Sequence, residues 1–459
     1  MPAETPGSSG YPRPAYAWYV VVVLLLAYIL AFVDREVIAQ LVPDIKKSFG
    51  ISDTEMSLIL GGAFAIFYTF CGTLIAWLAD RGNRRWLIFA GVLLWSVMTC
   101  ACGLATTYTQ LFFARVGVGA GEGALNPPAL SLLKDYFPKE QIGRAIGLYT
   151  AGVSSGSGLA FIIGGSLYPI LAARGPHALP IVGTLDPWQQ MFIYVGLPGL
   201  IVAALILTIR EPVRRDANGA PIDLATVRAG VAPIWDVLRY IFSRWRTYLV
   251  LFLSLSVLAI MAYGIGLWIP AFLQRSYGLS TAEVGHYIQL RGVVAIVFGL
   301  IGVIGGGWLC DILQRKYDDG YVRVCLLAYI FMAIGYSTFS LMPTPGLAIA
   351  MLIPATLGAA APTAAGAAAV IAIAPPNMRA QITALYYLVL NVVGLFVGPT
   401  AVGLLTNYYF RDESQIRYSL AIVAAVAATA GTLGLLYNLK HFRTAVVEVR
   451  SWHRPAQGL

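Results

Sequence analysis

The chain has 459 residues, of which 58% are hydrophobic and only 12% are charged, and its mean hydropathy is +0.73. Soluble domains carry about 25% charged residues, so this composition excludes an ordinary water-soluble protein and predicts a surface that faces lipid. The formal net charge of +9 does not indicate nucleic-acid binding, because the basic residues gather in alternate loops between apolar segments.

Twelve apolar segments, each long enough to cross a bilayer, predict twelve transmembrane helices. The first six lie at 16–41, 55–79, 86–106, 108–133, 143–172 and 189–209. The second six lie at 247–274, 283–310, 322–342, 346–374, 380–406 and 416–439. We therefore expect an all-α membrane protein of two pseudo-symmetric six-helix bundles, at 16–209 and 247–439. The linker at 210–246 has a basic end that predicts an interfacial helix, and tails are expected at 1–15 and 440–459.

The distribution of Lys and Arg predicts the orientation of these helices. One set of alternate loops, with the tails, holds 22 of the 31 basic residues, and the opposite loops hold 6. Basic residues favour the cytoplasmic side, so both termini and the linker are expected there. We expect a multi-pass protein of a bacterial inner membrane that works as a monomer, has the lipid bilayer as its partner and binds no nucleic acid.

Two turns repeat an acid-then-base pattern, WLADRGNRR at 77–85 and GGWLCDILQRK at 306–316, which favours an internal duplication. We expect these turns to cap helix ends and to form ion pairs that hold one conformation and break during transport. The candidate gating residues are Asp80, Arg81, Arg84, Arg85, Asp311 and Arg315.

Five charged residues lie within apolar segments: Asp34, Arg35, Arg115, Glu122 and Arg291. A charge near the centre of a membrane helix costs about 2.5–3.5 kcal/mol, and such charges usually line a water-filled cavity or pair with one another. The alternative is that they reach an interface or form static ion pairs.

Helical geometry limits which of these charges can meet. Arg115 and Glu122 are seven residues apart, which places them on one face about 10.5 Å apart along the axis, and Asn126 continues that stripe. Asp34 and Arg35 are adjacent and point about 100° apart. This geometry favours a pair across helices, such as Asp34 with Arg115.

The hypothesis from these residues is proton coupling by Asp34 and Glu122, with Arg115 as the partner that switches between them. Arg35, Arg291 and Asn126 are further candidates for switching or for substrate contact. The proton gradient is the expected driving force, with no cofactor and no metal. Aromatic and polar residues expected to border the cavity are Tyr263, Trp268, Tyr386, Tyr387 and Asn391.

Other motifs argue against an enzyme or an ATP-driven pump. The run GVGAGEG at 117–123 fails the GxGxxG spacing and is typical of close helix packing. No GxxxxGK[ST] motif occurs, and the four histidines form neither HExxH nor a catalytic triad pattern. No catalytic residue is predicted.

DRGNRR at 80–85 resembles the signature between helices 2 and 3 of the major facilitator superfamily. Asn83 replaces the glycine of most members, a departure shared by the spinster-like branch. Further segments that resemble this branch are FVDREVIAQLVPDI (32–45), ARVGVGAGEGALNPPALSLLKDYFP (114–138), GSGLAFIIGG (156–165), DPWQQMFIYVGLPGL (186–200) and REP (210–212). The second half matches mainly in layout.

The resemblance implies the major facilitator fold and proton-linked transport, and eukaryotic spinsters are associated with lysophospholipids and sphingosine phosphate. By position, Asp34 and Arg35 match the helix-1 Asp-Arg pair of the family, and Arg115 and Glu122 match its helix-4 Arg and Glu. The leading hypothesis is a proton-coupled transporter of an amphiphile such as a lysolipid. The alternatives are transport of a small organic anion or a drug, and an uncoupled receptor or scramblase.

Overall fold

The computed structural model describes residues 11–79, 81–179, 183–215, 233–375 and 378–452. The predicted gating residue Asp80 lies outside the described residues. The chain forms two compact units. Unit 1 comprises Met1–Phe49 and Ala63–Ala229, and unit 2 comprises Gly50–Gly62 and Gly230–Leu459. The short segment Gly50–Gly62, which the sequence predicted within the first bundle, therefore groups with unit 2.

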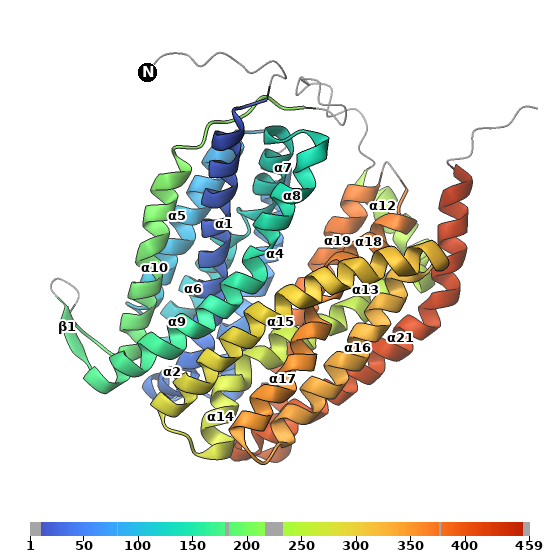
Figure 1. Cartoon of the computed structure of the whole chain (residues 1–459). Coiled ribbons are helices and arrows are strands. Elements are labelled where there is room, and N and C mark those ends of the chain that lie inside the picture. The colour runs from blue at the N-terminus through green and yellow to red at the C-terminus, as the bar shows by residue number, and fades with distance from the viewer. Residues whose placement is uncertain (1–10, 80, 180–182, 216–232, 376–377, 453–459) are drawn as a thin grey trace, which may run out of the picture. The chain divides into compact units, whose positions relative to one another are not determined.

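Unit 1 is built from helices and one small hairpin (Figure 1). Its helices are α1 (Pro14–Val37), η1 (Ile38–Leu41), α2 (Val42–Phe49), α4 (Ala63–Ala79), α5 (Arg84–Cys102), α6 (Tyr108–Glu122), α7 (Asn126–Tyr136), α8 (Lys139–Thr150), α9 (Gly152–Arg174) and α10 (Pro187–Ile206). Strands β1 (His177–Leu179) and β2 (Gly183–Leu185) pair antiparallel between α9 and α10, an addition that the all-α prediction missed.

Glycines allow the helices of unit 1 to pack closely. The helix α6 lies against α4 and α5, and α1 lies against α9. A Cβ atom at Gly119 would lie 2.5 Å from the carbonyl oxygen of Phe64, and one at Gly121 would lie 2.6 Å from the backbone nitrogen of Trp95. No side chain fits at these distances, so the glycine run 117–123 serves close helix packing, as predicted.

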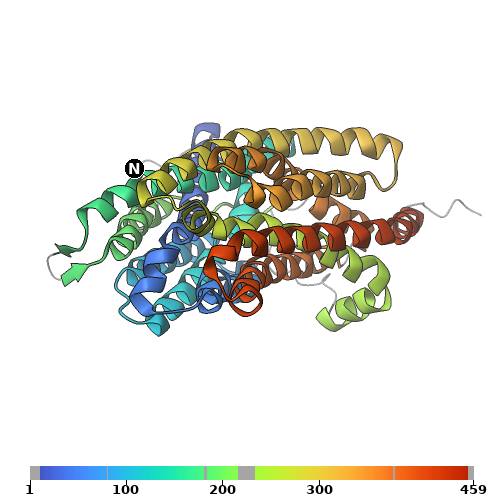
Figure 2. The same cartoon turned by 90° about the horizontal axis from the view of Figure 1, so that it is seen from below.

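Unit 2 holds the segment that precedes α4 and the second half of the chain. Its elements are α3 (Asp53–Ser57), η2 (Leu58–Gly62), α12 (Ile234–Ser243), α13 (Trp245–Ala259), η4 (Ile260–Ile265), η5 (Gly266–Trp268), α14 (Ile269–Tyr277), α15 (Thr281–Lys316), α16 (Gly320–Thr338), η6 (Phe339–Leu341), α17 (Pro345–Ala360), α18 (Pro362–Ile373), α19 (Arg379–Asn391), η7 (Val392–Val397), α20 (Gly398–Leu404), η8 (Leu405–Phe410), η9 (Glu413–Gln415) and α21 (Ile416–Trp452). The long helix α21 runs beside α13 and α16 (Figure 2).

A buried ion pair ties the segment 50–62 into unit 2. The Asp53 side chain is fully buried and accepts hydrogen bonds from both terminal nitrogens of Arg275, at 2.7 and 2.9 Å. The helix α3 begins at a capping box, in which Ser52 and Glu55 satisfy each other's backbone N–H groups. The bidentate pair of Asp53 with Arg275 joins residues that lie 222 positions apart in the sequence.

Among the described residues, eleven helical stretches are long and apolar enough to cross a membrane. The exception among the twelve predicted spans is 108–133, which forms the separate helices α6 and α7. Pro127 and Pro128 lack backbone N–H groups, so they begin the new helix α7 but cannot continue α6. A helix, α12, forms in the segment where an interfacial helix was predicted, and α21 extends to Trp452, beyond its predicted end at 439.

Candidate functional site

Among the buried charged residues of unit 1 are four that the sequence placed within apolar segments, and we call them the charged cluster: Asp34, Arg35, Arg115 and Glu122. Two lie on α1 and two on α6, and the most exposed of the four residues, Arg35, keeps only 7% of its surface. Buried charges are retained where they are paired or where they have a functional role, so these four residues remain candidates for the functional site of unit 1.

The ion pair of the charged cluster joins Arg35 to Glu122. The Nη2 atom of Arg35 lies 2.7 Å from Oε2 of Glu122. The guanidinium also lies over the rings of Phe32, Phe64 and Tyr68, with centroid distances of 4.9, 4.6 and 4.9 Å. Cation–π contacts of this kind supplement the ion pair and hold the arginine in place. We had expected Arg115 to take this role, so the assignment of the partner of Glu122 is corrected.

Asp34 points away from this pair, toward α5. Its Oδ2 accepts a hydrogen bond from the Thr99 hydroxyl at 3.0 Å, and its Oδ1 has no hydrogen-bond partner in the described part of the chain. Arg115 donates to the backbone carbonyl of Asp34, at 3.4 Å, and its guanidinium lies over the Phe64 ring, 5.6 Å from the centroid. The predicted contact between these residues therefore exists, but it does not join their charged groups. The cause is the 100° between successive helix positions, which turns Asp34 and Arg35 toward different neighbours.

Asn126 lies at the break between α6 and α7 and binds three tyrosines. Its amide nitrogen donates to the hydroxyl groups of Tyr28 and Tyr68, at 3.3 and 3.4 Å. The Tyr149 hydroxyl donates to its amide oxygen at 2.6 Å, and the rings of Tyr28 and Tyr149 stack 4.8 Å apart. Since Tyr68 also contacts Arg35, this network joins Asn126 to the charged cluster.

Sequence reasoning missed several members of this site: Tyr28, Glu36, Phe64, Tyr68, Thr99 and Tyr149. Glu36 follows the Asp34–Arg35 pair and is also buried, so its position in an apolar segment was an available signal. The chain has 25 tyrosines, and nothing in the sequence distinguished the three that meet Asn126.

The predicted site residues of unit 2 make different kinds of contact. Arg291 is buried on α15 and donates to the carbonyl of Gly266 at 3.0 Å. Trp268 is fully buried and donates from its indole to the carbonyl of Pro399 at 3.1 Å. We therefore assign Trp268 to the core of unit 2, a correction to its choice as a cavity residue. Its backbone lies where the chain passes from η5 into α14.

The other cavity candidates differ in exposure. Tyr386 is buried against Phe252, with ring centroids 5.6 Å apart, whereas Tyr387 is 44% exposed. Tyr263 and Asn391 are half-buried.

An ion network lies at the start of α5. Arg84 is fully buried and contacts Asp135 at 2.5 Å and Glu211 at 2.6 Å. The backbone N–H of Arg85 donates to Glu211 at 3.1 Å, and Arg81 is exposed. The acid-then-base turn at 77–85 thus supplies a buried arginine, Arg84. Its acidic partners come from α7 and from the residues after α10.

In unit 2 the corresponding buried acid is Asp319, which the sequence reasoning did not select. It contacts Arg323 at 2.9 Å and Arg443 at 2.7 Å. Asp311 and Arg315 are both exposed. Burial raises the pKa of Asp319, but hydrogen bonds from the two arginines outweigh it, so this pKa lies below its ordinary value. The expected ion pairing at this turn is therefore reassigned to Asp319.

In the part of the chain that the structure describes, no three His, Cys, Asp or Glu side chains are grouped so that they could hold a metal ion. The polar centre of unit 1 instead offers carboxyl groups, arginines and hydroxyl groups. These groups can exchange a proton or bind an anion.

Comparison with known proteins defines the family. The model of the Major Facilitator Superfamily matches residues 24–399. A solved bacterial homologue of the human lysosomal transporter spinster, inward-facing and unoccupied, is 26% identical, with a TM-score of 0.73 over 96% of this chain and 97% of that one. An MFS-type efflux pump of Mycolicibacterium smegmatis is 26% identical over 95% of this chain and 96% of its own length. A probable L-galactonate transporter of Escherichia coli is 26% identical over 72% of this chain and 70% of its own length.

These similarities confirm the predicted fold class and the resemblance to spinster proteins, and they confirm a transporter in place of an enzyme. Since the family model spans most of the sequence, the chain belongs to the major facilitator superfamily and is a multi-pass membrane protein that acts as a secondary transporter.

Proposed function

We propose that this transporter couples substrate movement to protons by alternating access, and that Asp34 and Glu122 are its proton-binding residues. The observation that carries the proposal is the buried charged cluster. It holds two acids and two arginines, and the binding of one proton to either acid raises its formal charge by one. A change of one charge at bilayer depth is large enough to bias a conformational equilibrium.

Glu122 links the proton to the substrate in this scheme. Protonation of Glu122 removes the charge that pairs with Arg35 at 2.7 Å. The aromatic rings around Arg35 keep the guanidinium in place, and without the Glu122 carboxylate it can bind an anionic group. Proton binding at Glu122 therefore makes Arg35 available to substrate.

The proposed substrate is an amphiphile with an anionic head group, such as a lysophospholipid or a sphingolipid-like molecule. Its support is the similarity to spinster proteins, together with a cation set among aromatic rings. A small organic anion is the second candidate. The guanidinium of Arg115, which makes no ion pair in the described part of the chain, and the similarity to a probable L-galactonate transporter favour it.

The proposal also includes the membrane in which the chain lies and the side on which its termini lie. The bias of basic residues supports a bacterial plasma membrane location with both termini in the cytoplasm. Tags fused to either end are expected to be protected from protease in right-side-out cells.

Proton flux in proteoliposomes tests the coupling. The purified chain is reconstituted with an internal pH-sensitive dye and challenged with a lysophospholipid, sphingosine phosphate or galactonate. We expect one of these classes to drive proton movement, and Asp34→Asn and Glu122→Gln to abolish it. Glu140→Gln is the matched control, because Glu140 is an exposed carboxylate of the same unit.

Two results would contradict the proposal. Undiminished proton movement in both variants would remove Asp34 and Glu122 from the coupling mechanism. Substrate that crosses the membrane without any proton movement would identify an uncoupled protein.

A further inference from the structure

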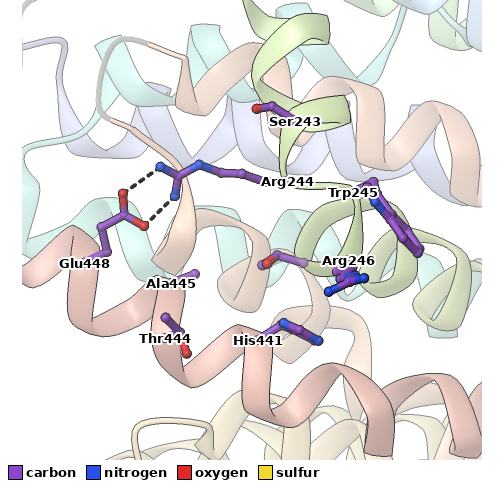
Figure 3. Close-up of a pocket in the computed structure, with 9 residues that line it drawn as sticks. Ser243, Arg244, Trp245, Arg246, His441, Thr444, Ala445 and Glu448 are labelled. Carbon is purple, nitrogen blue, oxygen red and sulfur yellow. Dashed lines mark hydrogen bonds and ion pairs between the residues drawn. The ribbon is translucent and has the colours of Figure 1, made fainter.

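A basic pocket lies in unit 2, at the junction of α12 and α13, where α21 passes beside them (Figure 3). Its volume is about 390 Å³. The α12–α13 junction contributes Arg244, Trp245 and Arg246 to its wall, and α21 contributes His441, Thr444 and Glu448. This pocket is distinct from the charged cluster, which belongs to unit 1.

The helix α12 has the character of a membrane-surface helix. Val237 and Ile241 are buried, and the helix packs on α13 and α19. Three further large apolar side chains of α12 are exposed: Ile234 at 45%, Trp235 at 77% and Phe242 at 60%. Trp245, at the start of the membrane-spanning stretch Trp245–Tyr277, is 48% exposed. Exposed tryptophans next to arginines at the end of a membrane span are typical of the lipid headgroup region.

The charges of the pocket leave one arginine uncompensated. Arg244 forms a bidentate pair with Glu448, in which Nη2 lies 2.6 Å from Oε1, so these two charges cancel (Figure 3). Arg246 is exposed and forms no ion pair in the described part of the chain. Its guanidinium lies only against the Trp245 ring, 5.5 Å from the centroid. The pocket therefore presents a net positive charge at the predicted membrane surface.

The backbone of this pocket is held in place. The amide nitrogen of Asn438, a fully buried residue on α21, donates to the carbonyls of Arg246 and Thr247, each at 2.9 Å. These bonds hold the first turn of α13 against α21. Arg246 is thus attached to a rigid backbone, which lowers the entropy lost when it binds a ligand.

We propose that this pocket binds the phosphate of an anionic phospholipid of the surrounding membrane, with Arg246 as the main phosphate contact. The lipid is a structural partner and is separate from the transported substrate. The exposed apolar residues of α12 lie beside the acyl chains, and the guanidinium of Arg246 binds the phosphate oxygens. The proposal does not depend on proton coupling.

Native mass spectrometry of the full chain in detergent tests this site, with dioleoyl phosphatidylglycerol as the probe and phosphatidylcholine as the zwitterionic comparison. We expect Arg246→Gln to weaken phosphatidylglycerol binding about fivefold, the effect of removing one arginine near a membrane surface. Arg315→Gln is the matched control, because Arg315 is an exposed arginine of unit 2 outside the pocket. A charge reversal, Arg246→Glu, is expected to weaken binding further.

Three results would overturn the proposal. Arg246→Gln could leave phosphatidylglycerol binding unchanged, or Arg315→Gln could weaken it equally, which would indicate a general effect of surface charge. Displacement of the lipid by inorganic phosphate alone would identify a site for a free anion.

Discussion

Replacement of Arg84 by methionine tests whether the buried ion network of unit 1 stabilises the fold. Methionine keeps much of the length of arginine but removes its charge and donors. The variant leaves Asp135 and Glu211 without the guanidinium that contacts them at 2.5 and 2.6 Å. It also removes the hydrogen bond from Arg84 to the carbonyl of Ser131.

The expected loss follows from the burial of each group. Removing one partner of a buried ion pair costs about 3–5 kcal/mol, because the other charge stays buried. The Asp135 side chain is only 5% exposed, whereas Glu211 is 23% exposed and partly screened by solvent. Asp135 also keeps a hydrogen bond from the backbone N–H of Arg215 at 3.1 Å. We therefore expect the lower end of the range, about 3 kcal/mol, or about 6–12 °C in Tm for a unit of this size.

Thermal unfolding of the purified chain in detergent, followed by size-exclusion chromatography of the remaining folded protein, measures this loss. Arg144→Met is the control, because Arg144 is an exposed arginine of the same unit and its replacement is expected to cost less than about 0.5 kcal/mol. The double variant Arg84→Met with Asp135→Asn should be more stable than Arg84→Met alone, since it no longer buries an unpaired carboxylate. A loss below about 1 kcal/mol in Arg84→Met, or strictly additive losses in the double variant, would refute the reasoning.

Two further predictions concern packing and pH. Gly121→Ala would place a methyl group 2.6 Å from a backbone nitrogen of α5 and is expected to lower stability by about 1–3 kcal/mol in the same assay, whereas Gly147→Ala, with open space around it, should not lower it. Asp319→Asn should lower Tm at neutral pH, because Arg323 and Arg443 lose their carboxylate partner. The pKa of Asp319 is depressed in the folded protein. The ionised carboxylate therefore stabilises the fold fully above the ordinary carboxyl pKa, and this stabilisation is lost as the pH falls through the depressed value. The Tm curves of wild type and Asp319→Asn are therefore expected to converge in acid, and a constant difference from neutral to acid pH would contradict the ion-pair origin.

The sequence could supply candidate residues for the site, but it could not supply the contacts between them. Asp34, Arg35, Arg115 and Glu122 could be selected because a charge in an apolar segment is costly, and that cost is visible in the sequence itself. Which arginine meets Glu122 could not be selected, because the answer depends on how α1 is rotated against α6. Arg35 and Glu122 are 87 residues apart, and no local pattern records their pairing.

In the ion networks, too, the sequence showed the charged motif and only the structure showed its partners. The basic residues of the turn at 80–85 were visible as a motif, but their partners Asp135 and Glu211 lie on other elements. In unit 2 the expected Asp311 is exposed, and Asp319 is buried because the turn after α15 folds it toward Arg443 on α21.

Hydropathy and charge bias are local properties, so the sequence by itself determined that this chain is a helical membrane protein, where most of its spans lie and which charges fall within apolar segments. Helix rotation and helix crossing points are set by packing between distant segments. Only the tertiary structure could decide that Arg35 holds Glu122, that Asp34 turns to Thr99 and that residues 50–62 join unit 2.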